Sequence, residues 1–142
     1  MSYFRETMEL THEAVLEMLR AAVASADELG QPQCIVIVDK SGEVLGSLRM
    51  TGSKYLSLLS ARTKARTAAS IGMESSKIPS EVAPLIAAAT QDAVTGLDGG
   101  VPIYMKGILL GGIGVGSGSP DQDRTVAIDA LRAVGAEIKA NS

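Results

Sequence analysis

A glycine-rich run, GGIGVGSGSPDQD at Gly111–Asp123, constrains the fold more than any other feature of the sequence. The run predicts a strand that leads into a helix, with Ser119 as the cap and Gln122 completing a capping box. Glycines let a second backbone or a ligand approach closely. The run therefore predicts either close packing in a tight turn or an anion site built from backbone amides at the helix start. It matches neither the dinucleotide fingerprint G-x-G-x-x-G nor a P-loop.

Composition excludes several classes of function. The 142 residues include 13 Lys and Arg against 16 Asp and Glu, and a net charge of -3 argues against a nucleic-acid partner. A single cysteine, Cys34, and a single histidine, His12, exclude a disulfide framework and a His- or Cys-rich metal site. No apolar run reaches ~18 residues, and the first residues lack the pattern of a signal peptide. We expect a single domain over residues 1–142, with no membrane partner, no metal and a cytoplasmic location.

The pattern along the chain predicts an α+β domain with a mostly antiparallel sheet. Turn and capping residues separate two hairpins from the helices around them. The expected elements are a helix between the cap Thr11 and Gly30, strands at 34–38 and 43–50, a helix at 54–71 capped by residues 51–53, a short helix at 80–90, a hairpin around Lys106-Gly107, and a last helix from Ser119 with apolar positions up to Ile138.

Four short motifs resemble those of the GlcG/HbpS-like family. Arg49-Met50-Thr51-Gly52 is similar to the family's RMDG hairpin end, and residues 64–69 (KARTAA) resemble its KARTA helix. Residues 99–103 (GGVPI) and 111–115 (GGIGV), with the later Asp121-Gln122-Asp123, resemble its remaining motifs. The order and spacing fit over a core of about residues 10–137.

This resemblance implies a profilin-like α/β/α sandwich with a five-stranded antiparallel sheet, assembled as a homo-oligomer. Some members of the family bind haem, and a related domain is fused to corrinoid adenosyltransferases. Many members are encoded among carbon-catabolic genes. The resemblance thus makes haem or a corrinoid the expected ligand and suggests a small-molecule-binding protein.

The candidate anion site combines two cations with glycine-rich backbone. Lys64 lies on a helix surface of small residues, where a lysine can be partly desolvated, and Arg49 would join it. Asp123 could accept a hydrogen bond from Lys64 or from the Gly99-Gly100 loop, or could simply stabilise the helix dipole. Backbone amides of Gly99, Gly100, Ser117 and Gly118 complete the candidate site. An ordinary solvated role for Lys64 remains the alternative.

Two further residues are candidates for a cofactor or a flat ligand. His12 is the candidate axial ligand of haem, against the alternative of an exposed histidine at a helix start. Tyr55 is a candidate for lining an apolar ligand pocket, against a role in the core. Cys34 opens an apolar strand and is expected to be a buried, unreactive thiol.

The residues leave more than one class of function open. One is the small-molecule-binding protein. Another is a small cofactor-independent enzyme acting on a carboxylated metabolite, with Lys64 as acid/base, Asp123 beside it, and Arg49 and the glycine amides holding the anion. A structural oligomer is a third, because Leu56, Leu58 and Leu59 crowd more of one helix than a single apolar face needs.

Overall fold

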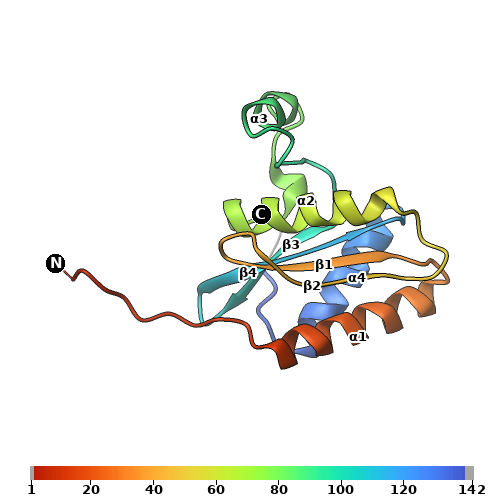
Figure 1. The fold of residues 1–142 in the computed structure, drawn as a ribbon, viewed down its shortest axis with the longest axis horizontal. Coiled ribbons are helices and arrows are strands. Elements are labelled where there is room, and N and C mark those ends of the chain that lie inside the picture. Colours follow the sequence, from red (N-terminus) through yellow and green to blue (C-terminus); the bar gives the residue numbers. More distant parts are fainter. Residues whose placement is uncertain (1, 140–142) are drawn as a thin grey trace.

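The fold is built on a four-stranded antiparallel sheet in a computed structural model that describes residues 2–139. The strand order across the sheet is β2-β1-β4-β3, so each hairpin supplies one edge strand and one central strand (Figure 1). The strands are β1 (Cys34–Asp39), β2 (Val44–Arg49), β3 (Gly100–Met105) and β4 (Ile108–Gly116). Both predicted hairpins are confirmed, and the α+β class with them.

The expectation of a fifth strand is wrong for the described residues. After the last helix, Glu137 forms a single isolated antiparallel bridge with Tyr104 of β3, and the long connection between the second helix and β3 forms no strand. This connection instead forms a short 3-10 helix, η1 (Ser75–Lys77), and a helix, α3 (Ala83–Ala89). Pro79 and Pro84 interrupt this stretch, and proline cannot donate a hydrogen bond to a sheet ladder.

Helices cover both faces of the sheet. α2 (Leu56–Ile71) lies over one face, and α1 (His12–Leu29) and α4 (Pro120–Ala133) lie over the other (Figure 1). The larger hydrophobic core lies between the sheet and the α1–α4 pair. A smaller core on the opposite face contains Cys34, Val36 and Val38 of β1 and Ala61, Ala65 and Ala69 of α2. No described helix is both long enough and apolar enough to cross a membrane.

Capping residues in the sequence predicted some helix starts correctly and one incorrectly. The Thr11 side chain caps α1, and the capping box of Ser119 and Gln122 at α4 is present as predicted. By contrast, α2 begins at Leu56, and Tyr55 precedes it without any side-chain cap, so the predicted cap at residues 51–53 is wrong. α3 is also shorter than predicted, because Pro84 is tolerated only in the first turn of a helix. α4 ends at Ala133 rather than near Ile138.

Glycines bring the backbone of α2 directly onto β4. A Cβ atom on Gly114 would lie 2.6 Å from the Ala65 backbone nitrogen and closer still to the Ala61 carbonyl oxygen. A Cβ atom on Gly112 would likewise meet the backbone of α2 at Ala65. The glycine-rich strand therefore serves close packing, one of its two predicted roles. This approach sets the position of every side chain on α2.

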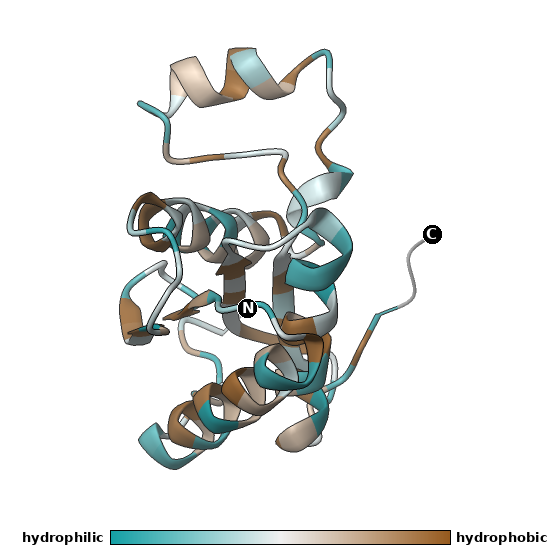
Figure 2. Cartoon of the chain, turned by 90° about the vertical axis from the view of Figure 1, so that its right-hand side faces the viewer, coloured by the Kyte–Doolittle hydropathy of each residue, from teal (hydrophilic) through white to brown (hydrophobic). Residues whose placement is uncertain are grey.

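Two segments extend away from this body. α3 contains no buried residue, and Figure 2 shows it standing apart from the sheet and the helices that cover the sheet. The residues before α1 run outward as an extended segment (Figure 1). α3 adds no residue to either hydrophobic core. Of the N-terminal segment, Met8 and Leu10 at its inner end pack against the larger core.

Replacement of Gly114 by alanine should destabilise the protein strongly. The added methyl group meets backbone atoms of α2, which cannot rotate away, so we expect a loss of about 2 kcal/mol or more in the free energy of unfolding. Gly116→Ala is the matched control on the same strand, since its Cβ would lie 3.0 Å from the Ser57 carbonyl oxygen. Urea unfolding of both variants measures the difference. Equal losses would contradict the proposed contact.

Candidate functional site

A buried ion pair joins the two helical layers of the fold. Lys64 Nζ lies 3.0 Å from Asp123 Oδ2 and donates a second hydrogen bond of 2.8 Å to the Val115 carbonyl oxygen. The other carboxylate oxygen of Asp123 accepts a 2.9 Å hydrogen bond from the Gly118 amide. Both charged side chains are only 5% exposed. The predicted hydrogen bond between Lys64 and Asp123 is therefore present.

Gly99, the residue before β3, has no side chain and therefore leaves room for this ion pair. Lys64 belongs to α2 on one face of the sheet, and Asp123 belongs to α4 on the other. A Cβ atom on Gly99 would lie 3.2 Å from Lys64 Nζ and 2.9 Å from the Asp123 Cβ. Gly99 also has φ +110, a conformation that other residues rarely adopt. Glycine at this position thus permits both the backbone path and the ion pair.

Opposing effects act on the Asp123 carboxyl group. Burial raises its pKa above the ordinary value, because burial penalises the charged form. The charge and hydrogen bond of Lys64 and the Gly118 amide act in the opposite direction, and the negative charge of Asp98 adds to the rise. A second ion pair lies beside the first, with Arg124 Nε 2.7 Å from Glu74 Oε1. This end of the sheet is therefore rich in buried charge.

Several groups predicted to hold an anion already have partners inside the protein. The Gly100 amide donates a 3.0 Å hydrogen bond to Ser75 Oγ. The Gly118 amide is bound to Asp123. These contacts give Lys64 and the glycine segments a part in holding α2, β3, β4 and α4 together. Their predicted roles toward a ligand remain predictions.

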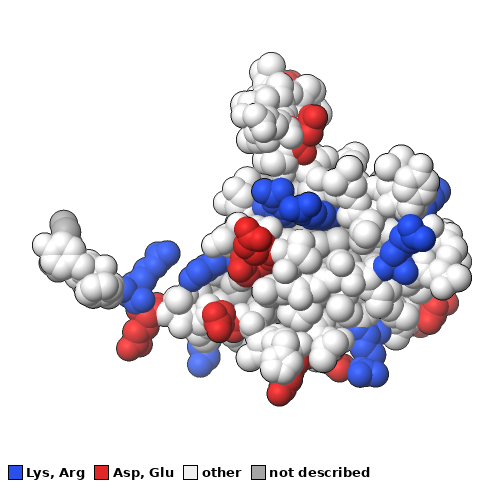
Figure 3. All heavy atoms as spheres, in the orientation of Figure 1, with Lys and Arg blue, Asp and Glu red and all other residues white. Residues whose placement is uncertain are grey.

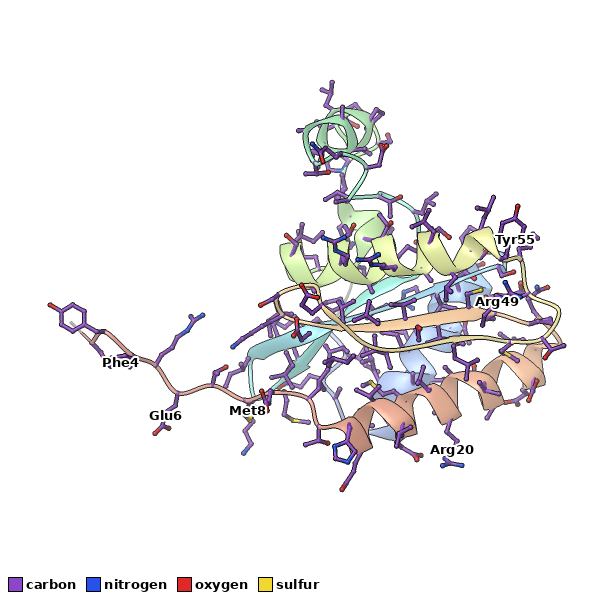
Figure 4. All side chains as sticks on the ribbon, in the orientation of Figure 1. Phe4, Glu6, Met8, Arg20, Arg49 and Tyr55 are labelled. Atoms are coloured by element: carbon purple, nitrogen blue, oxygen red, sulfur yellow. The ribbon has the colours of Figure 1, made fainter. Side chains whose placement is uncertain are left out.

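Three further residues were predicted to belong to the site, namely Arg49, Tyr55 and His12. Arg49 ends β2, and its Cα pairs with Cys34, which pairs in turn with Gly116 on β4. Figure 4 shows Arg49 and Tyr55 at the same end of the molecule, with Tyr55 70% exposed. His12 is the first residue of α1 and is exposed, at the end from which the N-terminal segment extends (Figure 1). Among residues 2–139, no hydrogen bond or ion pair joins any of these three residues to Lys64, whose partners are Val115 and Asp123.

A cleft that the sequence did not predict lies at the opposite end of the sheet from Arg49 and Tyr55. Its volume is about 920 Å³. Five separate segments of the chain form it, namely the N-terminal segment, the two hairpin turns, one side of α2 and the connection after α3. Its lining residues are Arg5, Glu6, Thr7, Lys40, Ser41, Gly42, Arg66, Ala69, Ser70, Thr90, Ala93, Val94, Gly107, Ile108 and Leu109.

Positive charge dominates the lining of this cleft. Arg5, Lys40 and Arg66 contribute three cations against the single carboxylate of Glu6. Among residues 2–139, none of these cations forms an ion pair. Figure 3 shows basic side chains along α2 and near the point where the N-terminal segment leaves the body. Unpaired cations in one concave surface favour an anionic ligand.

The Arg66 side chain lies against the first hairpin turn, at Gly42. A Cβ atom on Gly42 would lie 3.4 Å from Arg66 Nε, and Gly42 has φ +80. Lys40, from the same turn, donates a 3.1 Å hydrogen bond to Thr7 Oγ1. The KARTAA motif contains both Lys64 and Arg66, but only knowledge of the hairpin turns beside α2 reveals that Arg66 lines a cleft.

Comparison with known proteins gives the family. The family described as "Haem degrading protein HbpS-like" matches residues 10–132. The chain belongs to the HbpS-like family. The resemblance identified from the four sequence motifs is thereby confirmed.

Relatives of this HbpS-like chain include a corrinoid adenosyltransferase and two solved structures. The corrinoid adenosyltransferase PduO of Citrobacter freundii is 33% identical over 132 residues, which cover 89% of this chain and 39% of that enzyme. A crystal structure of a PduOC:heme complex has a TM-score of 0.87 and 28% identity, covering 94% of this chain and 100% of that one. A double mutant of Streptomyces reticuli HbpS has a TM-score of 0.83 and 32% identity, covering 93% and 91%. The chain thus spans about two-fifths of PduO.

Removal of the lysine from the ion pair should destabilise this HbpS-like domain in a pH-dependent way. Lys64→Met leaves a buried carboxylate unpaired, so we expect a loss of about 3–5 kcal/mol at neutral pH. Lys64 lowers the pKa of Asp123, so its removal should raise that pKa further above the unfolded-state value, and the carboxyl group is then neutral and better tolerated at low pH but charged and unpaired at high pH. The variant should therefore lose less stability at about pH 4 than at about pH 8.

Urea unfolding of Lys64→Met at both pH values tests this expectation. The control is the double variant Lys64→Met/Asp123→Asn, which carries no buried charge at this position. Its loss should vary much less between the two pH values. A pH-independent loss in Lys64→Met, or an equal pH dependence in both variants, would contradict the pairing.

Proposed function

We propose that the protein binds a carboxylate-bearing tetrapyrrole of the haem class in the cleft beside Arg66. The three unpaired cations in a cleft of about 920 Å³ carry this proposal. The volume lies within the usual range for small-molecule sites. Support for the class of ligand comes from the family description and from the haem complex of the PduOC structure.

The cleft offers both kinds of contact that such a ligand needs. A haem-type ligand has a flat apolar ring and carboxylate side chains. Arg5, Lys40 and Arg66 would hold the carboxylates through charge-assisted hydrogen bonds. Apolar lining residues, among them Val94 and Leu109, would contact the ring. The lining therefore fits the periphery of a tetrapyrrole.

The same lining does not offer an ordinary ligand for haem iron. Histidine, cysteine, methionine and tyrosine are the side chains that usually hold haem iron, and the residues that line the cleft include none of them. We therefore assign recognition to the carboxylates and derive no role for the metal. His12, the axial ligand expected from sequence, remains a prediction outside the cleft lining.

Haem titration of an Arg66 variant tests the proposed site. Arg66→Gln removes the guanidinium but keeps a polar side chain, and loss of a charge-assisted hydrogen bond costs about 1.5–3 kcal/mol. We expect the dissociation constant for haem, measured from the Soret band, to rise roughly 10- to 150-fold. The matched control is Arg62→Gln, because Arg62 is an exposed cation of the same helix outside the cleft lining.

Three outcomes of this titration are informative. Equal dissociation constants for both arginine variants would reject the cleft as the site. A wild-type protein without a Soret change would reject haem itself. In the same experiment His12→Ala should preserve folding, and loss of the spectral change in that variant would support His12 as the axial ligand instead of recognition through carboxylates alone.

We also propose that the chain assembles into a closed homo-oligomer. Leu56, Leu59 and Leu85 are 65%, 62% and 68% exposed. Leu56 and Leu59 line a groove of about 370 Å³ together with Ala87 and Val94 of the α3 segment. Exposed apolar surface of this kind is typical of interfaces. A second copy of the chain is the occupant that fits a closed assembly.

Light scattering at micromolar concentration tests the assembly. We expect a single species of at least twice the chain mass of 14.7 kDa. Leu56→Ser/Leu59→Ser should shift the population toward the monomer, because it removes apolar area from the groove. The control is Leu16→Ser, an exposed leucine of α1 with 61% exposure. A wild-type protein that stays near 14.7 kDa would reject the proposal.

A further inference from the structure

The N-terminal segment carries two aromatic side chains beside the cleft. Tyr3 and Phe4 are 88% and 89% exposed, and Figure 4 shows Phe4 on the extended segment outside the body. The next three residues, Arg5, Glu6 and Thr7, line the cleft. We call residues 2–4 the aromatic arm. The arm therefore begins where one wall of the cleft ends.

The N-terminal segment is anchored to the body at Thr7, Met8 and Leu10, whereas the aromatic arm is not. Lys40 donates a hydrogen bond to Thr7, and Met8 and Leu10 pack against the larger hydrophobic core. Within the arm, Ser2 and Phe4 form local hydrogen bonds with each other. A change of backbone angles at Arg5 and Glu6 would thus move the arm without disturbing the core.

The aromatic arm offers what the cleft lining does not contain. The whole chain has one Phe and three Tyr, and half of these four aromatic residues lie in the arm. The cleft lining includes no aromatic residue. Aromatic rings stack favourably on flat π-systems, and exposed rings leave a large apolar surface in water. A flat ligand in the cleft would give both rings a surface to cover.

We propose that Tyr3 and Phe4 fold over the cleft and cover the outward face of a bound planar, carboxylate-bearing ligand. This inference rests on the proposed function, because it requires the ligand to occupy the cleft beside Arg66. The required movement is short. Phe4 is bonded to Arg5, which already lines the cleft, and Tyr3 is one residue further, within the roughly 3.3–3.6 Å that each residue spans.

Closure of the arm would act mainly on ligand release. The cations hold the carboxylates whether the arm is open or closed, so they govern how strongly the ligand is recognised. The arm would add ring contacts after the ligand has bound and would exclude water from the charged contacts, which strengthens them. Loss of the arm should therefore raise the dissociation rate more than it lowers the association rate.

The test measures haem release from the full-length protein. Haem-loaded protein is mixed with excess apomyoglobin, and transfer is followed in the Soret region. For Tyr3→Ser/Phe4→Ser we expect release to be about tenfold faster than for wild type, given the usual strength of aromatic contacts. Leu16→Ser, an exposed apolar residue of α1 outside the cleft lining, is the control and should release haem at the wild-type rate.

Trypsin cleavage after Arg5 gives a second measurement that does not depend on the variants. Arg5 is exposed in the structure, and closure over haem should slow its cleavage in the loaded protein relative to the free protein. Cleavage after Arg20, an exposed arginine of α1 outside the cleft lining, provides the internal comparison. Equal haem protection at both positions would contradict closure of the arm.

The possible failures of the arm and of the site are distinguishable. Absence of haem binding, or equal affinity in the Arg66→Gln and Arg62→Gln variants, rejects the proposed function. Haem binding that depends on Arg66, with unchanged release from Tyr3→Ser/Phe4→Ser, overturns the arm alone. A smaller particle mass for that double variant together with unchanged release would show that the arm docks on a second copy, which also overturns the inference.

Discussion

The close approach of α2 to β4 is the constraint on which the other features of the structure depend. Gly112 and Gly114 remove the side chains that would keep the helix backbone away from the strand. At that short distance Lys64 reaches past the start of β3 and pairs with Asp123 on the far helix. The same approach places Arg66 beside the first hairpin turn, where it contributes to the cleft. One backbone contact thus positions both a structural ion pair and a candidate ligand site.

Lys64 and Arg66 therefore differ in their chemistry although they lie two residues apart on α2. Lys64 is buried and its ammonium group is engaged by a carboxylate and a carbonyl oxygen. Arg66 is half-buried, has no ion-pair partner among the described residues, and faces an open volume. A buried, paired charge contributes to the specificity of the fold, whereas an unpaired cation in a cleft retains its capacity to bind an anion. This contrast favours Arg66 as the residue that meets a ligand.

Sequence patterns predicted the features that arise from neighbouring residues. The cap at Thr11, the capping box at Ser119 and both hairpins follow from short-range geometry. The pairing of Lys64 with Asp123 was one of the roles that the sequence left open for Asp123, and the structure shows that pairing. The cleft was not predicted, because its lining comes from five segments that are far apart in the sequence. The fifth strand was expected from family resemblance alone, and the connection before β3 does not form it.

One wall of the cleft belongs to the connection after α3, at Thr90, Ala93 and Val94, and α3 itself adds nothing to either hydrophobic core. Changes in that segment therefore cost the core little. Substitutions or insertions in that segment can therefore change the shape of the cleft, because folding constrains this part of the chain little. The sheet and its buried ion pair lie in other parts of the chain, so such changes can leave them unaltered.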